Sequence, residues 1–298
     1  MKHILHFLVC LLFLSIGLHP AAFAQEDLLK VLRSDSTEHQ DAVIATFKSS
    51  KIINIQTNET VKKHNLDVRI SHLFGNVGKE SGGGIHTLYG FDQSEDIRIG
   101  FQYGVTDCFT IGVSRAKRLE NLEGLLKYKL IEQSEYSSIP ISATVFSNMT
   151  YSARSNALVE KSVYRFTYLA ELIFARKFNS KFSVVIVPSF LHRNFVNYLD
   201  KNNTLSLGGG LRYKFTPSTS FIADYSHSFL SENLLVKNRD VLGAGIEIET
   251  GGHVFTIMFS NASGLLENDF LVNTYDSWTK GGYKISFIIS RMFRLKKD

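Results

Sequence analysis

Cysteine is almost absent from this sequence of 298 residues. Of its 2 cysteines, Cys10 lies in the apolar N-terminal run and Cys108 is the only one beyond that run. A single thiol cannot form an intramolecular disulfide, and no Cys-x-x-Cys pair is present to bind a metal or to attach haem. These absences exclude a disulfide-stapled fold and a covalent haem protein.

Long apolar runs are also missing after residue 25. No stretch there approaches the roughly 20 consecutive apolar residues that a transmembrane helix needs. The chain is nevertheless 44% hydrophobic, and 23 Phe and 12 Tyr supply most of its 12% aromatic share. This composition suits an outer-membrane protein that crosses the bilayer with strands.

The chain also lacks a large excess of positive or negative charge, and it lacks local ligand motifs. The net charge is only +5, and the basic residues occur singly or at the extreme C-terminus instead of forming the dense stripe of a nucleic-acid-binding surface. The glycine triplets 82–84 and 208–210 lack the Gly-Lys-Ser/Thr of a phosphate loop. The isolated His192, His227 and His253 lack the paired spacing of metal ligands. We therefore expect no nucleic-acid partner, no cofactor and no metal.

The N-terminus has the order of a secretory signal peptide. Lys2 precedes an apolar run at 4–18, and Ala22 and Ala24 provide a small-x-small cleavage site. The run of about 15 residues is shorter than a membrane-spanning helix. We expect residues 1–24 to be removed and the rest of the chain to be exported.

Period-two alternation dominates the chain from Leu66 onwards. In 205–215, Leu205, Leu207 and Leu211 alternate with polar residues and glycine, so a strand there has one apolar and one polar or small face. Segments of this kind, mostly about 9 to 13 residues long, suit tilted transmembrane strands. The predicted strands are 64–74, 95–105, 108–116, 121–131, 139–150, 162–178, 181–193, 204–215, 219–230, 239–250, 252–261 and 281–293.

The predicted connections alternate between tight and long, as in outer-membrane barrels with short periplasmic turns and longer external loops. The connections at 117–120 and 132–138 depart from this alternation. We predict an all-β fold, a transmembrane antiparallel up-and-down β-barrel of about twelve strands over 64–298, with fourteen strands as the alternative. The stretch 51–60 is strand-like, but a thirteenth strand would start the barrel on the wrong side, so we assign 25–63 to an N-terminal periplasmic or plug segment.

The last predicted strand carries an assembly motif. Residues 280–287 resemble the polar-x-Gly-x-x-apolar-x-apolar pattern by which barrel-assembly machinery recognises its clients. The position of the pattern in the final strand favours this interpretation, although the tail at 294–298 departs from the usual terminal aromatic residue. We expect that machinery to be a partner during biogenesis.

The stretches 45–53, 66–75, 90–92, 97–107 and 124–129 resemble a Bacteroidota family of outer-membrane β-barrel proteins labelled domain of unknown function 5777. The resemblance covers most of the chain after residue 25. It implies a porin-like barrel in the outer membrane of a Gram-negative bacterium. It supplies neither a substrate nor a catalytic residue.

Polar and charged residues on the inward faces of these strands would share a narrow lumen, where they can line a solute path or merely stiffen the barrel. We expect a channel or solute-uptake component that contacts outer-membrane lipids and a small solute. A non-conducting barrel that docks a periplasmic protein through 25–63 is the alternative. The predicted lumen-lining residues are Arg98, Gln102, Lys127, Lys129, Arg165, Glu171, Arg212, Lys214, Asp224, Glu247, Glu249 and Lys284.

A barrel-hosted hydrolase is the least favoured function. His227 shares the outward face of its strand with Tyr225, whereas Ser226 and Ser228 point inward, so a serine nucleophile and its base cannot meet. His72 also lies on an outward face near a strand end. We expect both histidines at the membrane interface, and we predict no catalytic residue.

Overall fold

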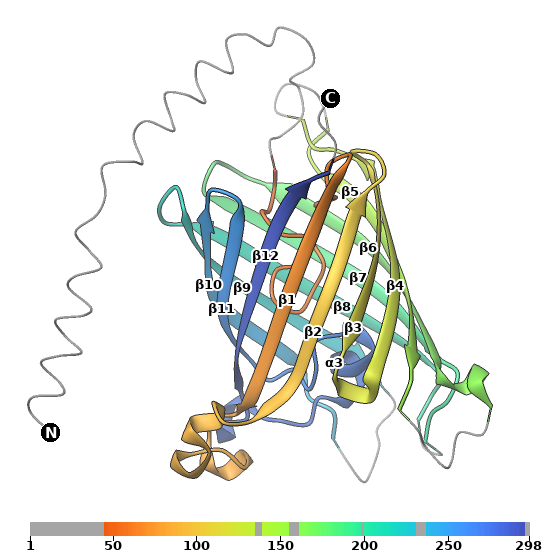
Figure 1. Ribbon diagram of the computed structural model, residues 1–298, viewed down its shortest axis with the longest axis vertical. Coiled ribbons are helices and arrows are strands. Elements are labelled where there is room, and N and C mark those ends of the chain that lie inside the picture. Colours follow the sequence, from red (N-terminus) through yellow and green to blue (C-terminus); the bar gives the residue numbers. More distant parts are fainter. Residues whose placement is uncertain (1–44, 135–138, 155–160, 198–199, 231–236, 296–298) are drawn as a thin grey trace, which may run out of the picture. The chain divides into compact units, whose positions relative to one another are not determined.

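The computed structural model describes residues 45–134, 139–154, 161–197, 200–230 and 237–295; the predicted signal peptide lies outside them. In these residues twelve antiparallel strands each pair with their sequence neighbours, and β1 pairs with β12 to close a barrel (Figure 1). The twelve-strand prediction is confirmed and the fourteen-strand alternative is wrong. The strands are β1 Asn65–Asn76, β2 Ser94–Gly104, β3 Phe109–Ala116, β4 Asn121–Ile131, β5 Ser142–Ser152, β6 Phe166–Lys177, β7 Phe182–Arg193, β8 Asn203–Lys214, β9 Thr219–Phe229, β10 Val241–Thr250, β11 His253–Ser260 and β12 Lys284–Arg294.

The helices are short and lie in the connections. The α-helix α3 spans Glu267–Asn273 between β11 and β12. The 3-10 helices are η1 Lys79–Ser81, η2 Ile85–Gly90, η3 Arg118–Glu120, η4 Ser162–Arg165 and η5 Trp278–Lys280. None of the helices in the described residues combines the length and the hydropathy needed to cross a membrane.

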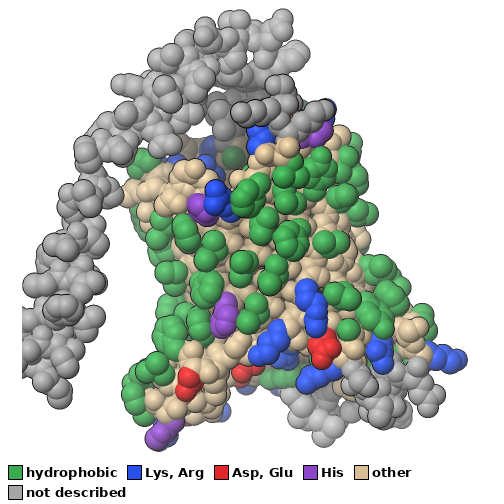
Figure 2. Space-filling view, in the orientation of Figure 1, with side chains coloured by type: hydrophobic (Ala, Val, Ile, Leu, Met, Phe, Trp, Pro, Cys, Tyr) green, Lys and Arg blue, Asp and Glu red, His purple; other side chains and the backbone are tan. Residues whose placement is uncertain are grey.

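Alternation places apolar side chains outside and polar side chains inside. On β2, Ile99 and Phe101 are each 43% exposed, whereas Arg98 and Gln102 are buried. Lipid hydrocarbon covers the outward side chains of a transmembrane barrel, so their exposure to the surroundings is favourable. Figure 2 shows the resulting hydrophobic side chains across one face of the wall.

The connections differ at the two ends of the barrel. At one end, here called the turn end, β6–β7, β8–β9 and β10–β11 are joined by residues 178–181, 215–218 and 251–252. At the other, the loop end, 77–93 and 261–283 are much longer. Short turns face the periplasm in outer-membrane barrels, so the loop end is the external one.

One part of the inner wall is apolar, which strict alternation does not predict. Inward residues of β4, β5, β6, β7 and β9, among them Leu125, Phe146 and Ile173, form one buried cluster with Phe47, Ile52, Ile53 and Ile55. The latter four belong to residues 45–61, here called the inner segment. The apolar wall patch therefore exists because another part of the chain covers it.

Glycine in β8 allows this close approach. A Cβ atom built on Gly210 would lie 2.6 Å from Ile52 Cδ1, and one on Gly208 would lie 3.1 Å from Ile55 Cγ2. A side chain at Gly210 would therefore crowd Ile52 and force its side chain to shift. Gly208 and Gly210 thus serve packing within the barrel.

Candidate functional site in the barrel lumen

The inner segment folds back on itself between Lys51 and Gln56, which form an isolated antiparallel bridge. The N–H of Ile52 donates to the carbonyl of Ile55 at 3.0 Å and closes the turn. Its residues bond to inward side chains of the wall, and Figure 1 shows it as a loop within the barrel. The segment therefore occupies part of the lumen.

A single carboxylate anchors the tip of this turn. Asp224 on β9 accepts the backbone N–H groups of Ile53 (3.2 Å), Asn54 (2.5 Å) and Ile55 (3.0 Å). The Asn54 side-chain amide donates to the same carboxylate at 2.8 Å and to Ser260 Oγ at 3.2 Å. Charge-assisted bonds of this kind are about twice as strong as neutral ones. Asp224 therefore fixes both the position and the orientation of the tip of the turn.

A single ammonium group holds the other side of the turn. Lys127 on β4 donates through Nζ to the Ser50 carbonyl at 2.9 Å, to Gln56 Oε1 at 3.1 Å and to the Thr57 carbonyl at 3.1 Å. A lysine ammonium has three N–H donors, so this group is fully used. Lys127 and Asp224 thus hold the inner segment from different strands of the wall.

Residues 261–283, here called the outer loop, enter from the loop end. Glu267, Asp269 and Phe270 of α3 are buried. Asp96 on β2 accepts the N–H of Leu265 at 3.0 Å and ties the loop to the wall. Burial raises the pKa of Asp269 to about 7; Arg118, whose Nε lies 3.6 Å away, opposes the rise, and Asp96 adds to it.

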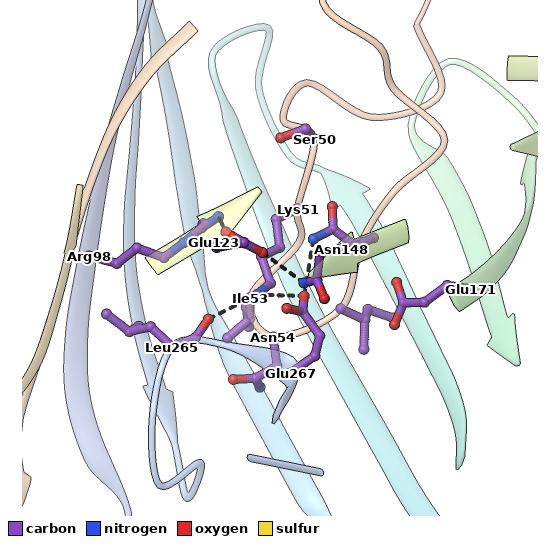
Figure 3. Close-up of polar contacts among 12 residues, drawn as sticks. Ser50, Lys51, Ile53, Asn54, Arg98, Glu123, Asn148, Glu171, Leu265 and Glu267 are labelled. Carbon is purple, nitrogen blue, oxygen red and sulfur yellow. Dashed lines mark hydrogen bonds and ion pairs between the residues drawn. The ribbon is translucent and has the colours of Figure 1, made fainter. Parts of the chain in front are cut away.

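The two insertions meet inside the barrel. Lys51 Nζ lies 2.9 Å from Glu267 Oε1 and donates to the Leu265 carbonyl at 3.0 Å. The Gln56 amide donates to the same Glu267 oxygen at 3.0 Å. Figure 3 shows Lys51 and Glu267 approaching one another from their separate segments. This Lys51–Glu267 contact links a segment that precedes β1 to a loop that precedes β12.

Charged pairs line the wall around the insertions. Arg98 Nη2 lies 2.5 Å from Glu123 Oε2, which also accepts Ser114 Oγ. Towards the turn end, Arg212 pairs with Glu247 at 2.7 Å and with Glu249 at 2.5 Å. The wall therefore carries both signs of charge in close alternation.

Most of the predicted lumen residues lie inside the barrel. Lys214 and Glu249 are only half-buried, near the turn end. Arg165 lies in η4, because β6 begins at Phe166, and it is therefore not part of the strand wall. The buried ones are Arg98, Gln102, Lys127, Lys129, Glu171, Arg212, Asp224, Glu247 and Lys284.

Several residues of the site were not among those predicted. Asp96 and Glu123 lie on the inward faces of their strands, so the alternation alone could have identified them. Lys51 and Glu267 lie outside the strands, where period two carries no signal. Their contact joins positions 216 residues apart, which numbering alone does not reveal.

The outward histidines have other surroundings. His227 Nδ1 lies 2.8 Å from Asp240 Oδ1, and the Tyr225 hydroxyl donates to the same carboxylate. Among the described residues no serine, threonine or cysteine bonds to His227, and no three His, Cys, Asp or Glu side chains gather as a metal site. His72 stacks on Phe287 with ring centroids 5.5 Å apart. Both histidines belong to the rim of the wall.

Residues 47–293 match the family model of a membrane-bound β-barrel domain, DUF5777. Among solved structures, NanC porin has a TM-score of 0.46 and 9% identity over 76% of this chain and 98% of its own. KdgM porin has 0.43 and 10% over 77% and 98%, and LpxR from Salmonella typhimurium has 0.39 and 11% over 77% and 100%. No curated protein matches the sequence significantly.

Proposed function

Because the chain belongs to the DUF5777 family of membrane-bound β-barrel domains and lies in the outer membrane, we propose that it is a channel for a small polar solute, closed at rest. The predicted plug segment 25–63, through its inner segment, and the outer loop are the closing elements. The observation that carries the proposal is the polar attachment of the inner segment, held by Asp224 and Lys127.

Polar attachment makes release of the inner segment feasible. A buried charge that loses its partner in a dry interior is strongly destabilising. In a lumen, water can replace the peptide groups that now satisfy Asp224 and Lys127 once the segment leaves. The charged pairs of the wall, such as Arg98 with Glu123, would then line a hydrated path.

The apolar contacts explain why the closed state dominates. Phe47, Ile52, Ile53 and Ile55 are all buried against the wall. Burial of each such side chain contributes about 1.5–3 kcal/mol. Spontaneous opening is therefore infrequent, and a solute that binds the outer loop can favour it through the Lys51–Glu267 contact, which joins that loop to the inner segment.

A reversible disulfide tests the proposal in the full chain. We design Gly208→Cys with Ile55→Cys in a Cys108→Ser background, because the Gly208 and Ile55 positions are in contact. A disulfide needs Cβ atoms about 3.5–4.5 Å apart, which this contact permits. In planar bilayers we expect openings from the reduced protein and none from the oxidised protein. The Ile55→Cys single variant should show the same openings under reducing and oxidising conditions.

Deletion of residues 25–61 provides the second arm. We expect steady current from the deletion variant, provided that heat-modifiable migration on a gel confirms a folded barrel. Silence from the folded deletion variant and from the reduced double-cysteine variant would contradict the channel and favour the non-conducting barrel that docks a periplasmic protein. Turnover of lipid or peptide that is lost in His227→Ala would instead indicate a hydrolase.

A further inference from the structure

The outer wall has a hollow near the loop end that the channel does not use. Its volume is about 670 Å³, and it lies between the start of β2, the end of β3, η3 and the residues after β5. The outward side chains of Ile97 and Ile99 line its membrane side. The hollow is therefore open to the bilayer and separate from the lumen.

Basic side chains surround the other side of the hollow. Arg115, Lys117, Arg118 and Arg154 all line it. Figure 2 shows Lys and Arg side chains gathered on the lower part of this face, below the hydrophobic band. The hollow thus combines an apolar half, continuous with the lipid-facing wall, and a cationic half at the level where lipid headgroups begin.

We propose that this hollow binds a phosphorylated lipid of the outer leaflet, with its phosphate on Arg115, Lys117 and Arg154 and an acyl chain along Ile97 and Ile99. Arginine suits this role because its guanidinium presents several N–H donors in a plane that matches phosphate oxygens. Basic side chains near a membrane surface attract anionic lipids.

The existing contacts of these side chains fit the proposal. Arg115 donates to the Ala116 carbonyl at 2.5 Å, and Lys117 donates to the Ser94 carbonyl, so both are positioned by neutral acceptors and keep further donors. Arg154 makes no side-chain hydrogen bond or ion pair to the residues that the structure describes. Arg118 is directed to Asp269 and contributes charge at longer range.

Acidic side chains do not cancel this charge. Glu95 and Glu120 also line the hollow, against four basic residues. Glu120 lies 4.0 Å from Arg115 and both side chains are about half exposed, so this pair is weak. A net positive charge remains next to an apolar surface, which suits an anionic lipid better than free phosphate.

Native mass spectrometry of the folded full chain in detergent tests the site, with diphosphorylated lipid A as the probe. We expect Arg115→Gln with Lys117→Gln to weaken binding by about tenfold or more, since hydrogen bonds to charged groups are lost. The matched control is Arg176→Gln with Lys181→Gln, which removes two exposed basic side chains near the turn end. Binding to the control should equal that to the unmodified chain.

Two further probes identify the chemistry. Fully dephosphorylated lipid A should bind as weakly as the double variant, and millimolar inorganic phosphate should not displace lipid A. Equal binding to both double variants, equal binding of the dephosphorylated lipid, or displacement by inorganic phosphate would overturn the proposal. If the double variant loses heat-modifiable migration, Arg154→Gln alone provides the test, because its side chain supports no described contact.

Discussion

At the level of single residues, Asp224 accepts most of the hydrogen bonds that attach the tip of the inner segment to the wall. One carboxylate receives three consecutive backbone N–H groups of the inner segment and a side-chain amide. The backbone geometry that aims these groups at one point arises from the tight turn between Ile52 and Ile55. The alternation of β9 predicts that Asp224 points inward. The alternation does not predict that backbone N–H groups of the inner segment bond to it.

Asp224→Asn should release the tip of the inner segment. A neutral amide oxygen is a weaker acceptor than a carboxylate, and its NH2 group would face the peptide donors. We expect a loss of about 1–3 kcal/mol in attachment of the segment. Faster hydrogen exchange at Ile53 to Ile55 and more frequent openings in bilayers would report it. The exposed Asp240→Asn variant should match the unmodified chain, and slow exchange in Asp224→Asn would contradict the assigned role.

We expect docking of the outer loop to depend on pH through Asp269. Its pKa rises from an ordinary 3.8 to about 7 on burial, so the docked loop binds a proton more tightly than the released loop. The contribution to docking is therefore complete below about pH 4 and is lost as the pH rises through about 7. Arg118 opposes this shift and Asp96 strengthens it.

We expect α3 amides to exchange faster at pH 8 than at pH 6 after correction for the intrinsic rate. Asp269→Asn should remove this difference, because the amide does not titrate, while Asp240→Asn should retain it. An unchanged pH response in Asp269→Asn would show that another group controls the loop.

At the level of elements, the Lys51–Glu267 contact joins the inner segment to the outer loop. Both side chains are buried, at 5% and 1% exposure. Breaking a buried pair from one side leaves a charge without a partner and is typically destabilising by about 3–5 kcal/mol. The pair therefore couples the two insertions more firmly than a surface ion pair would.

A double-mutant cycle tests this coupling. Lys51→Met and Glu267→Gln should each speed exchange in the other segment, and the double variant should cost less than the sum of the two. The four corners of the cycle are the unmodified chain, the two single variants and the double variant. Hydrogen exchange of each segment is measured separately in all four proteins. Strictly additive effects would show that the insertions are independent. The exposed pair Arg115 and Glu120 provides a control cycle in which we expect little coupling.

The elements differ in how far the sequence predicts them. The twelve strands are predictable because lipid selects apolar residues at every second position. The apolar inner patch was not, since inward Leu169 and Ile173 interrupt the expected polar face. That interruption is itself a signal: strands that are apolar on both faces, such as β6 and β7, must meet another apolar segment. The residues that fulfil this requirement, Ile52, Ile53 and Ile55, lie in the stretch that resembled an extra strand.

At the level of the whole molecule, the barrel separates three environments. Lipid surrounds the outward faces, the inner segment and outer loop occupy the lumen, and the basic hollow beside η3 lies at the external edge of the band. Arg118 connects two of these regions, since it lines the hollow and pairs with Asp269 of the outer loop. Residues of the proposed closing elements and of the proposed lipid site are thus neighbours, although they lie on different sides of the wall.

The seam between β1 and β12 has a further consequence for assembly. The barrel closes only when its last strand pairs with its first, and the inner segment immediately precedes that first strand. In the closed barrel the segment also bonds to β4 and β9, which lie far from the seam in the order of strands. We therefore expect it to hold distant strands of the sheet together during closure, so that the final strand seals the wall around a filled interior.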